Sequence, residues 1–179
     1  MTGIGGAAQV APFSSKRVLH VGCGGDPLPE WLEGAEETRL DIDEQWKPDV
    51  VASMTDMGQI GPFDVVLAQH CLEHLALHDV NTALSEFARV LDRGGFAFIV
   101  VPDLQGVAAT DDVLFFAPSG PVTGFDMIYG HSGLTRTNPH MAHKSGFTAK
   151  TLERVMRPYF QTVQVNRIKH HNLIGVGIK

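Results

Sequence analysis

The feature of this sequence that most constrains its fold is a series of short, almost continuous apolar runs. Asp64–Ala68 (DVVLA) and Phe96–Val101 (FAFIVV) show no alternation of apolar and polar residues. Such runs are typical of strands that are buried on both faces, as in a parallel sheet covered by helices. Three runs of the same kind come earlier in the chain: Arg17–Val21, Arg39–Ile42 and Asp49–Ala52.

Helical periodicity follows two of these stretches. A helix that ends at Gly94 and Gly95 is predicted by apolar residues that share one face of a 3.6-residue repeat. These residues are Val80, Ala83, Leu84, Phe87, Ala88 and Leu91. Thr148–Met156 predicts a second helix, with Thr148 as its N-cap.

Two more apolar runs, Thr162–Ile168 and Leu173–Ile178, close the chain. The residues between them, around His170 and His171, are few enough for an antiparallel hairpin. Strands that alternate with helices favour an open, doubly wound α/β sheet with right-handed crossovers. The sequence therefore predicts a Rossmann-like sheet that is mostly parallel, with an antiparallel last strand.

Composition limits the class of protein. The chain has 179 residues, 44% apolar and 19% charged, which suits one globular domain. Its net charge of −6 disfavours a large nucleic-acid footprint, and no apolar stretch approaches the roughly 18 residues that span a membrane. Cys23 and Cys71 form no disulfide or zinc pattern, and the N-terminus lacks a signal-peptide pattern. We expect a cytoplasmic domain over residues 16–179, a flexible arm over residues 1–15, and either a monomer or a homodimer.

A glycine turn follows the first predicted strand, in the stretch HVGCGG. Gly22 and Gly24 there would let a backbone approach a ligand at the carboxyl end of the strand. The dinucleotide fingerprint needs a third glycine where this chain has Pro27, and no Gly-Lys-Ser/Thr follows, which excludes a P-loop. Asp26 and Pro27 instead predict the cap and first residue of a short helix over residues 28–33.

An acidic residue ends the second predicted strand, in RLDID. Asp41 comes 19 residues after Gly22, at a position where a carboxylate can accept hydrogen bonds from both hydroxyls of a ribose. Asp43 is the nearby alternative. The glycine turn and Asp41, at this spacing, together predict a nucleoside site.

Four stretches in succession resemble motifs of the class I S-adenosylmethionine-dependent methyltransferases, closest to a small bacterial branch of the methyltransferase type 11 kind. They are VLHVGCGG, RLDID, FDVVLAQHCLEHL and FARVLDRGGFAFIVVPD, within residues 17–103. The resemblance implies a seven-stranded sheet with its last strand antiparallel, and S-adenosyl-L-methionine as cofactor. The third-glycine position of the family's turn holds Asp26 here, so the resemblance does not define the contacts between this turn and the cofactor.

The resemblance also implies which residues bind the cofactor. Gly22, Cys23 and Gly24 would line its methionine half, and Asp41, with Ile42 beside it, would hold the ribose. Ser53 stands where the family often has an acid for the adenine amino group, and Met54 would pack on the ring. Gln69 and His70 would face the sulfur end.

The acceptor side is less defined by the sequence. Residues 103–147 show no clean period and are predicted to cover the acceptor, with short helices at residues 104–109 and 112–117. His70, His131 and His143 are the candidate bases. His140 and His143 (HMAH) would share a helical face but lack a third ligand, so we predict no metal site.

Three functions remain open from the sequence. The leading hypothesis is a methyltransferase that acts on a small-molecule acceptor, with no membrane partner. An NAD(P)-dependent oxidoreductase is disfavoured by Pro27. A non-catalytic domain that binds S-adenosylmethionine and a protein partner is the third.

Overall fold

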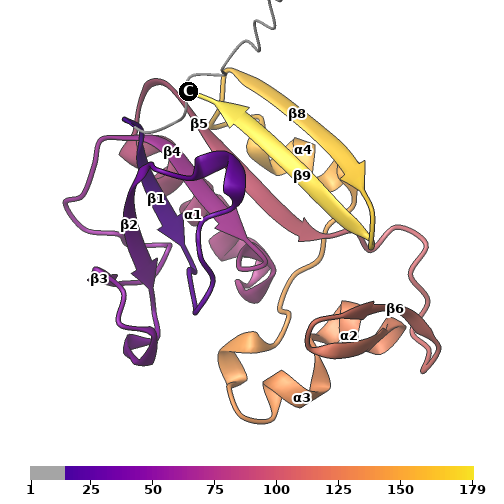
Figure 1. Cartoon of the computed structure of the whole chain (residues 1–179). Coiled ribbons are helices and arrows are strands. Elements are labelled where there is room, and N and C mark those ends of the chain that lie inside the picture. The colour runs from indigo at the N-terminus through magenta and orange to yellow at the C-terminus, as the bar shows by residue number, and fades with distance from the viewer. Residues whose placement is uncertain (1–14) are drawn as a thin grey trace, which may run out of the picture.

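The computed structural model describes residues 15–179, which form one seven-stranded sheet and one two-stranded sheet. In spatial order the large sheet contains β3 (Val50–Val51), β2 (Glu36–Asp41), β1 (Arg17–Val21), β4 (Phe63–Gln69), β5 (Leu91–Pro102), β9 (Asn172–Ile178) and β8 (Thr162–Ile168). Neighbours are parallel, except that β9 runs antiparallel to both β5 and β8 (Figure 1). The predicted fold class is confirmed. Apart from Ser15, the predicted N-terminal arm lies outside the described residues.

Two glycines that were expected to end a helix lie inside a strand instead. α1 (Leu77–Val90) stops earlier, and β5 begins at Leu91 rather than at the predicted Phe96. Gly94 N–H donates to the carbonyl of Lys179, and Lys179 N–H donates to the carbonyl of Gly95. Pairing with the end of the chain therefore draws both glycines into the sheet.

One face of the sheet carries both long helices. α1 and α4 (Ala149–Met156) pack into the same apolar cluster as the inward-facing residues of β1, β4 and β5. Phe87 of α1 and Leu152 of α4 are fully buried. Thr148 accepts a hydrogen bond from Thr151 N–H in a capping box, so its predicted role as N-cap is confirmed.

The opposite face holds a smaller cluster around Leu32, which belongs to a 3₁₀ turn, Glu30–Leu32. The helix expected over residues 28–33 is wrong, because the structure has only this turn, capped by Pro29. Two prolines, Pro27 and Pro29, remove backbone donors and hold the residues before them extended. The chain therefore starts its helical turn late and ends it within three residues.

Residues 104–147 form a small module of their own. It contains the hairpin β6 (Val113–Ala117) and β7 (Gly120–Thr123), the helices α2 (Gly124–Tyr129) and α3 (Ser132–Thr135), and the 3₁₀ turn Pro139–Met141. The predicted helices at residues 104–109 and 112–117 are wrong. The second is β6, since its Val-Leu-Phe-Phe run favours a strand and leads to a two-residue loop.

The module lies beyond the carboxyl ends of the parallel strands, on the side to which the arrowheads of β1, β2 and β5 point (Figure 1). Ligands of open α/β sheets bind at this side. Among residues 15–179, none of the helices combines the length and the apolar character that crossing a membrane requires.

Candidate functional site

A cavity of about 660 Å³ opens where the carboxyl ends of β1, β2 and β4 face the module. Eight of the nine residues predicted to bind the cofactor line it: Gly22, Gly24, Asp41, Ile42, Ser53, Met54, Gln69 and His70. The ninth, Cys23, is buried beneath the turn, and this burial raises the pKa of its thiol. The structure thus gathers residues from four separate stretches of sequence onto one wall.

The two glycines of the turn serve different purposes. Gly22 has φ +62°, and a Cβ there would lie 2.6 Å from Cys71 Cβ, so packing requires a glycine. Gly24 has φ +47°, but a Cβ there would meet nothing within 4 Å. A side chain at Gly24 would therefore enter the cavity, and its absence leaves room for a ligand.

Asp41 ties the strand ends together beneath the cavity. Its buried carboxylate accepts the N–H of Gly24 at Oδ2 (2.9 Å) and the N–H of Asp43 at Oδ1 (2.9 Å). Each carboxylate oxygen has a second lone pair for a ligand hydroxyl. Asp43 instead accepts the N–H of Gln45 (3.1 Å) at the start of the 3₁₀ turn Glu44–Trp46. Asp43 also lines the cavity, and its Oδ2 accepts a hydrogen bond from Asn138 Nδ2 of the module (3.4 Å).

Arg39 supports the glycine turn from below and was missed by sequence reasoning. Its guanidinium donates to the carbonyls of Gly24 (2.6 Å) and Asp26 (2.9 Å), and it pairs with Glu37 (3.2 Å). Glu37 in turn lies 2.8 Å from Nδ1 of the buried His20. Its position at the start of the predicted strand Arg39–Ile42 was the only signal for it in the sequence.

Trp46 is a second residue that the sequence did not indicate. It lines the cavity, and its ring lies 3.2 Å from the position that a Cβ would take at Gly25. The module contributes six more lining residues: Leu134, Thr137, Asn138, His140, Met141 and Lys144. No local pattern identifies them, because they reach the cavity only through the return of the chain.

The three candidate bases occupy different places. His70 lines the cavity with a half-exposed side chain, and its Nδ1 lies 3.5 Å from Glu73 Oε1. His131 caps α3, where its Nδ1 accepts the N–H of Gly133 (3.2 Å). His143 lies outside the cavity lining, and burial lowers its pKa. The geometry therefore brings only His70 of these three to the cavity.

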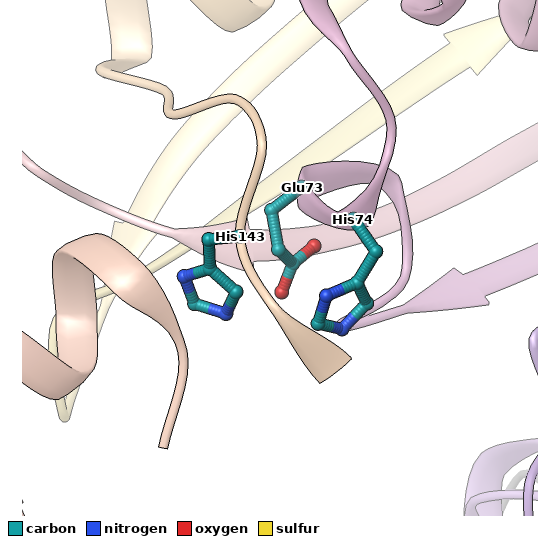
Figure 2. Close-up of side chains that lie close together, drawn as sticks. All are labelled: Glu73, His74 and His143. Carbon is teal, nitrogen blue, oxygen red and sulfur yellow. The ribbon is translucent and has the colours of Figure 1, made fainter. Parts of the chain in front are cut away.

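Glu73, His74 and His143 lie close together (Figure 2). One carboxylate oxygen of Glu73 and one ring nitrogen of each histidine, atoms that could ligate a metal ion, lie within 4.8 Å of one another. His74 directs Nδ1 at the carbonyl of Ala142 (3.2 Å) and Nε2 at the carbonyl of His70 (3.1 Å). Both of its ring nitrogens therefore face acceptors. His74 thus joins the end of β4 to the module.

The fold is Rossmann-like, with a glycine turn and an acid at the ends of two neighbouring strands. Residues 19–99 match the methyltransferase domain family, which confirms the resemblance drawn from the sequence. A ubiquinone biosynthesis O-methyltransferase from Caulobacter vibrioides is 32% identical over 52% of this chain and 43% of its own length. The chain thus spans less than half of this curated relative.

Two solved structures show the same fold. One is 1,6-didemethyltoxoflavin-N1-methyltransferase of Burkholderia thailandensis, solved with bound 1,6-didemethyltoxoflavin and S-adenosylhomocysteine. It is 17% identical, with a TM-score of 0.62 over 94% of this chain and 77% of its own. The other, a SAM-dependent methyltransferase from Archaeoglobus fulgidus, is 17% identical, with a TM-score of 0.61 over 94% of this chain and 88% of its own.

Proposed function

We propose that this protein transfers a methyl group from S-adenosylmethionine to a small-molecule acceptor. The observation that carries the proposal is the meeting of Gly24 and Asp41 on one cavity wall, with open space above the glycine. S-adenosylmethionine supplies an electrophilic methyl group on a sulfonium that is an excellent leaving group.

The residues that line the cavity suit each part of this cofactor. Free lone pairs on Asp41 suit the two ribose hydroxyls. Ile42, Ser53 and Met54 lie on the wall beyond Asp41, where an adenine ring would find apolar contact and one hydroxyl. The open space above Gly24 would take the methionine end, which would direct the sulfur toward Gln69 and His70.

For methyl transfer the protein must also align the acceptor with the methyl group and exclude water. In-line displacement needs the acceptor atom about 3 Å from the methyl group, in a near-attack geometry. Leu134 and Met141 of the module line the cavity and would help to exclude water from it. We therefore assign residues 103–147 the role of covering the acceptor.

Two alternatives are less favoured. A dinucleotide-binding oxidoreductase would need a third turn glycine at Pro27, where the chain forms only a short 3₁₀ turn and no long helix. A non-catalytic binding domain would not need the polar residues that the module directs at the cavity, such as His140 and Lys144.

Ligand-dependent stability tests the proposal. S-adenosylhomocysteine at 100 times its Kd should stabilise the fold by about 2.7 kcal/mol, whereas NADH and NADPH should not. Calorimetric titration with the four compounds would check this result. A stabilisation by NADH alone would contradict the methyltransferase assignment, and transfer of a labelled methyl group to an acceptor would complete it.

A further inference from the structure

Glu73 is a buried charged residue that the fold alone does not explain. It is 1% exposed, its Oε1 lies 3.5 Å from His70 Nδ1, and its Oε2 has no hydrogen-bond partner. A buried carboxylate oxygen without a partner destabilises a fold. The position of Glu73, one side chain away from the cavity, points to a role in the chemistry there.

His70 is held in a conformation that favours glycine. Its φ is +50°, and its N–H donates to the carbonyl of Val100 (2.9 Å). Its own carbonyl faces His74 Nε2 (3.1 Å), so the backbone is fixed on both sides. Strain of this kind at a residue that lines a cavity is typical of functional sites.

The other imidazoles around Glu73 are engaged elsewhere. His74 directs both nitrogens at carbonyl oxygens, and His143 directs Nδ1 at the carbonyl of Met127 (3.0 Å). Figure 2 shows the Glu73 carboxylate between these two rings, and the side chain is buried. His70 is therefore the histidine near Glu73 that can use one nitrogen for the carboxylate and present the other to the cavity.

We propose that Glu73 orients His70 as the general base for an acceptor with a phenolic hydroxyl, an inference that rests on the proposed function. Nδ1–H of His70 faces Glu73, which leaves Nε2 to take the hydroxyl proton. As the oxygen–carbon bond forms, the sulfur–carbon bond breaks, and S-adenosylhomocysteine leaves with the electron pair on sulfur. The carboxylate balances the charge of the imidazolium.

The walls near His70 suit an aromatic acceptor. Leu75, next to His74, and Met141, next to the Ala142 carbonyl that His74 faces, supply apolar contact to the cavity, and Lys144 supplies a cation in its lining. An imidazole is matched in basicity to a phenol but not to an aliphatic alcohol. Glu73 is thus a positioning residue, and His70 is the catalytic one.

An optical probe tests the pair without turnover. 4-Nitrocatechol, titrated into the complex with S-adenosylhomocysteine, should bind as its anion at a pH where the free probe is protonated. The absorption band of the bound anion reports this ionisation. His70→Asn should abolish the band, since asparagine tolerates a positive φ but is no base. His170→Asn is the matched control, because His170 also has a positive φ (+60°) but lies outside the cavity lining. A band that survives His70→Asn, or is absent from the wild type, overturns the proposal.

Turnover with two acceptors separates a base from a structural residue. With catechol, His70→Asn should lower kcat by about 100-fold or more, and Glu73→Gln by less, while the KM for S-adenosylmethionine should change only a few-fold. With 4-nitrophenol at a pH where it is already ionised, both losses should shrink to a few-fold. Equal losses of kcat with both acceptors would contradict the role of the His70–Glu73 pair. The role would also be contradicted if a chelator abolished turnover and a divalent cation restored it.

The two proposals fail in different ways. If wild-type protein does not bind S-adenosylhomocysteine, the methyltransferase assignment fails. If it binds but His70→Asn changes neither the probe band nor kcat, only the assignment of the base fails. Melting curves of each variant exclude unfolding, and if Glu73→Gln does not fold, His70→Asn still decides the result.

Discussion

The two sides of the cavity are built by different means. On the cofactor side, Gly22 N–H donates to the carbonyl of Leu40 (2.8 Å) and Asp41 accepts Gly24 N–H, so backbone pairing across the sheet places each group. On the acceptor side, short local caps hold the module. Asp126 forms a capping box with Thr123 at the start of α2. We therefore expect the cofactor side to be the more rigid of the two walls.

Asp126 shows how local these caps are. Although burial raises its pKa, hydrogen bonds from Ser132 and Thr123 outweigh that effect and hold the pKa at about 2. The side chain is therefore occupied in shaping the module and is not offered to an acceptor. The module meets the cofactor side at few polar points. Lys144 N–H and Ser145 N–H both donate to the carbonyl of Glu73 (2.9 and 3.1 Å).

The largest effect on cofactor binding should come from Gly24→Val. A side chain at Gly24 enters the cavity, so the stabilisation of about 2.7 kcal/mol that S-adenosylhomocysteine gives at 100 times its Kd should vanish. The positive φ should also destabilise the fold by about 1–3 kcal/mol. Gly94→Val is the control, because Gly94 has φ +80° and open space but lies outside the cavity lining. Thermal melts without and with ligand measure the stability of the free protein and its gain on binding. Equal shifts of the melting temperature by the ligand in the two variants would show that Gly24 does not face the cofactor.

Asp41→Ala should weaken S-adenosylhomocysteine by about 1–3 kcal/mol in calorimetric titration, as expected for lost charge-assisted hydrogen bonds. It should also lower the melting temperature, since the N–H groups of Gly24 and Asp43 lose their acceptor. Asp43→Ala should weaken binding less, because Asp43 mainly holds its own turn. A larger loss of affinity with Asp43→Ala would exchange the roles of the two acids.

The same contrast explains what the sequence could predict. Gly24 and Asp41 follow strands that are neighbours in a parallel sheet, so knowing the strand order already places them together. The prediction of a helix over residues 28–33 was wrong because Pro29 holds the residue before it extended, and the cap expected at Asp26 does not offset this. Trp46 and Met141 could not be predicted, since no strand register fixes where their segments return to the sheet.

A smaller effect on affinity, but a large one on turnover, is expected from changes in the module. The double variant Leu134→Ser and Met141→Ser should keep S-adenosylhomocysteine affinity within a few-fold, because both residues belong to the module and not to the glycine turn or the strand ends that are assigned to the cofactor. Methyl transfer should fall strongly, since water then reaches the reacting atoms. Phe116→Ser, at a 77% exposed position of β6 outside the cavity lining, should change neither quantity. Unchanged turnover in the double variant would remove the covering role of the module.

The smallest effect should be a loosening of the module at mildly acidic pH. Burial lowers the pKa of His143, so the closed module prefers the neutral imidazole, while an opened module has the ordinary pKa near 6.5. As pH falls below about 6.5, the open state gains a proton that the closed state does not, and closure loses stability until the lower pKa is passed. Hydrogen exchange of residues 131–145, corrected for intrinsic rates, should therefore show less protection at pH 5.5 than at pH 7.5.

The control for this prediction is His143→Asn, which should remove the pH dependence. Glu73, His74 and His70 also face His143; the carboxylate favours its charged form, and the two imidazoles oppose it. A pH dependence that survives in His143→Asn would therefore belong to His70 or His74. Residues 20–26 and 41–43 should keep their protection at both pH values, since the backbone N–H groups of Gly22, Gly24 and Asp43 donate within the sheet side. The Asp43 side chain accepts a hydrogen bond from the module, from Asn138 Nδ2 (3.4 Å). If they loosen in parallel with the module, the two sides of the cavity open as one unit and the contrast between them fails.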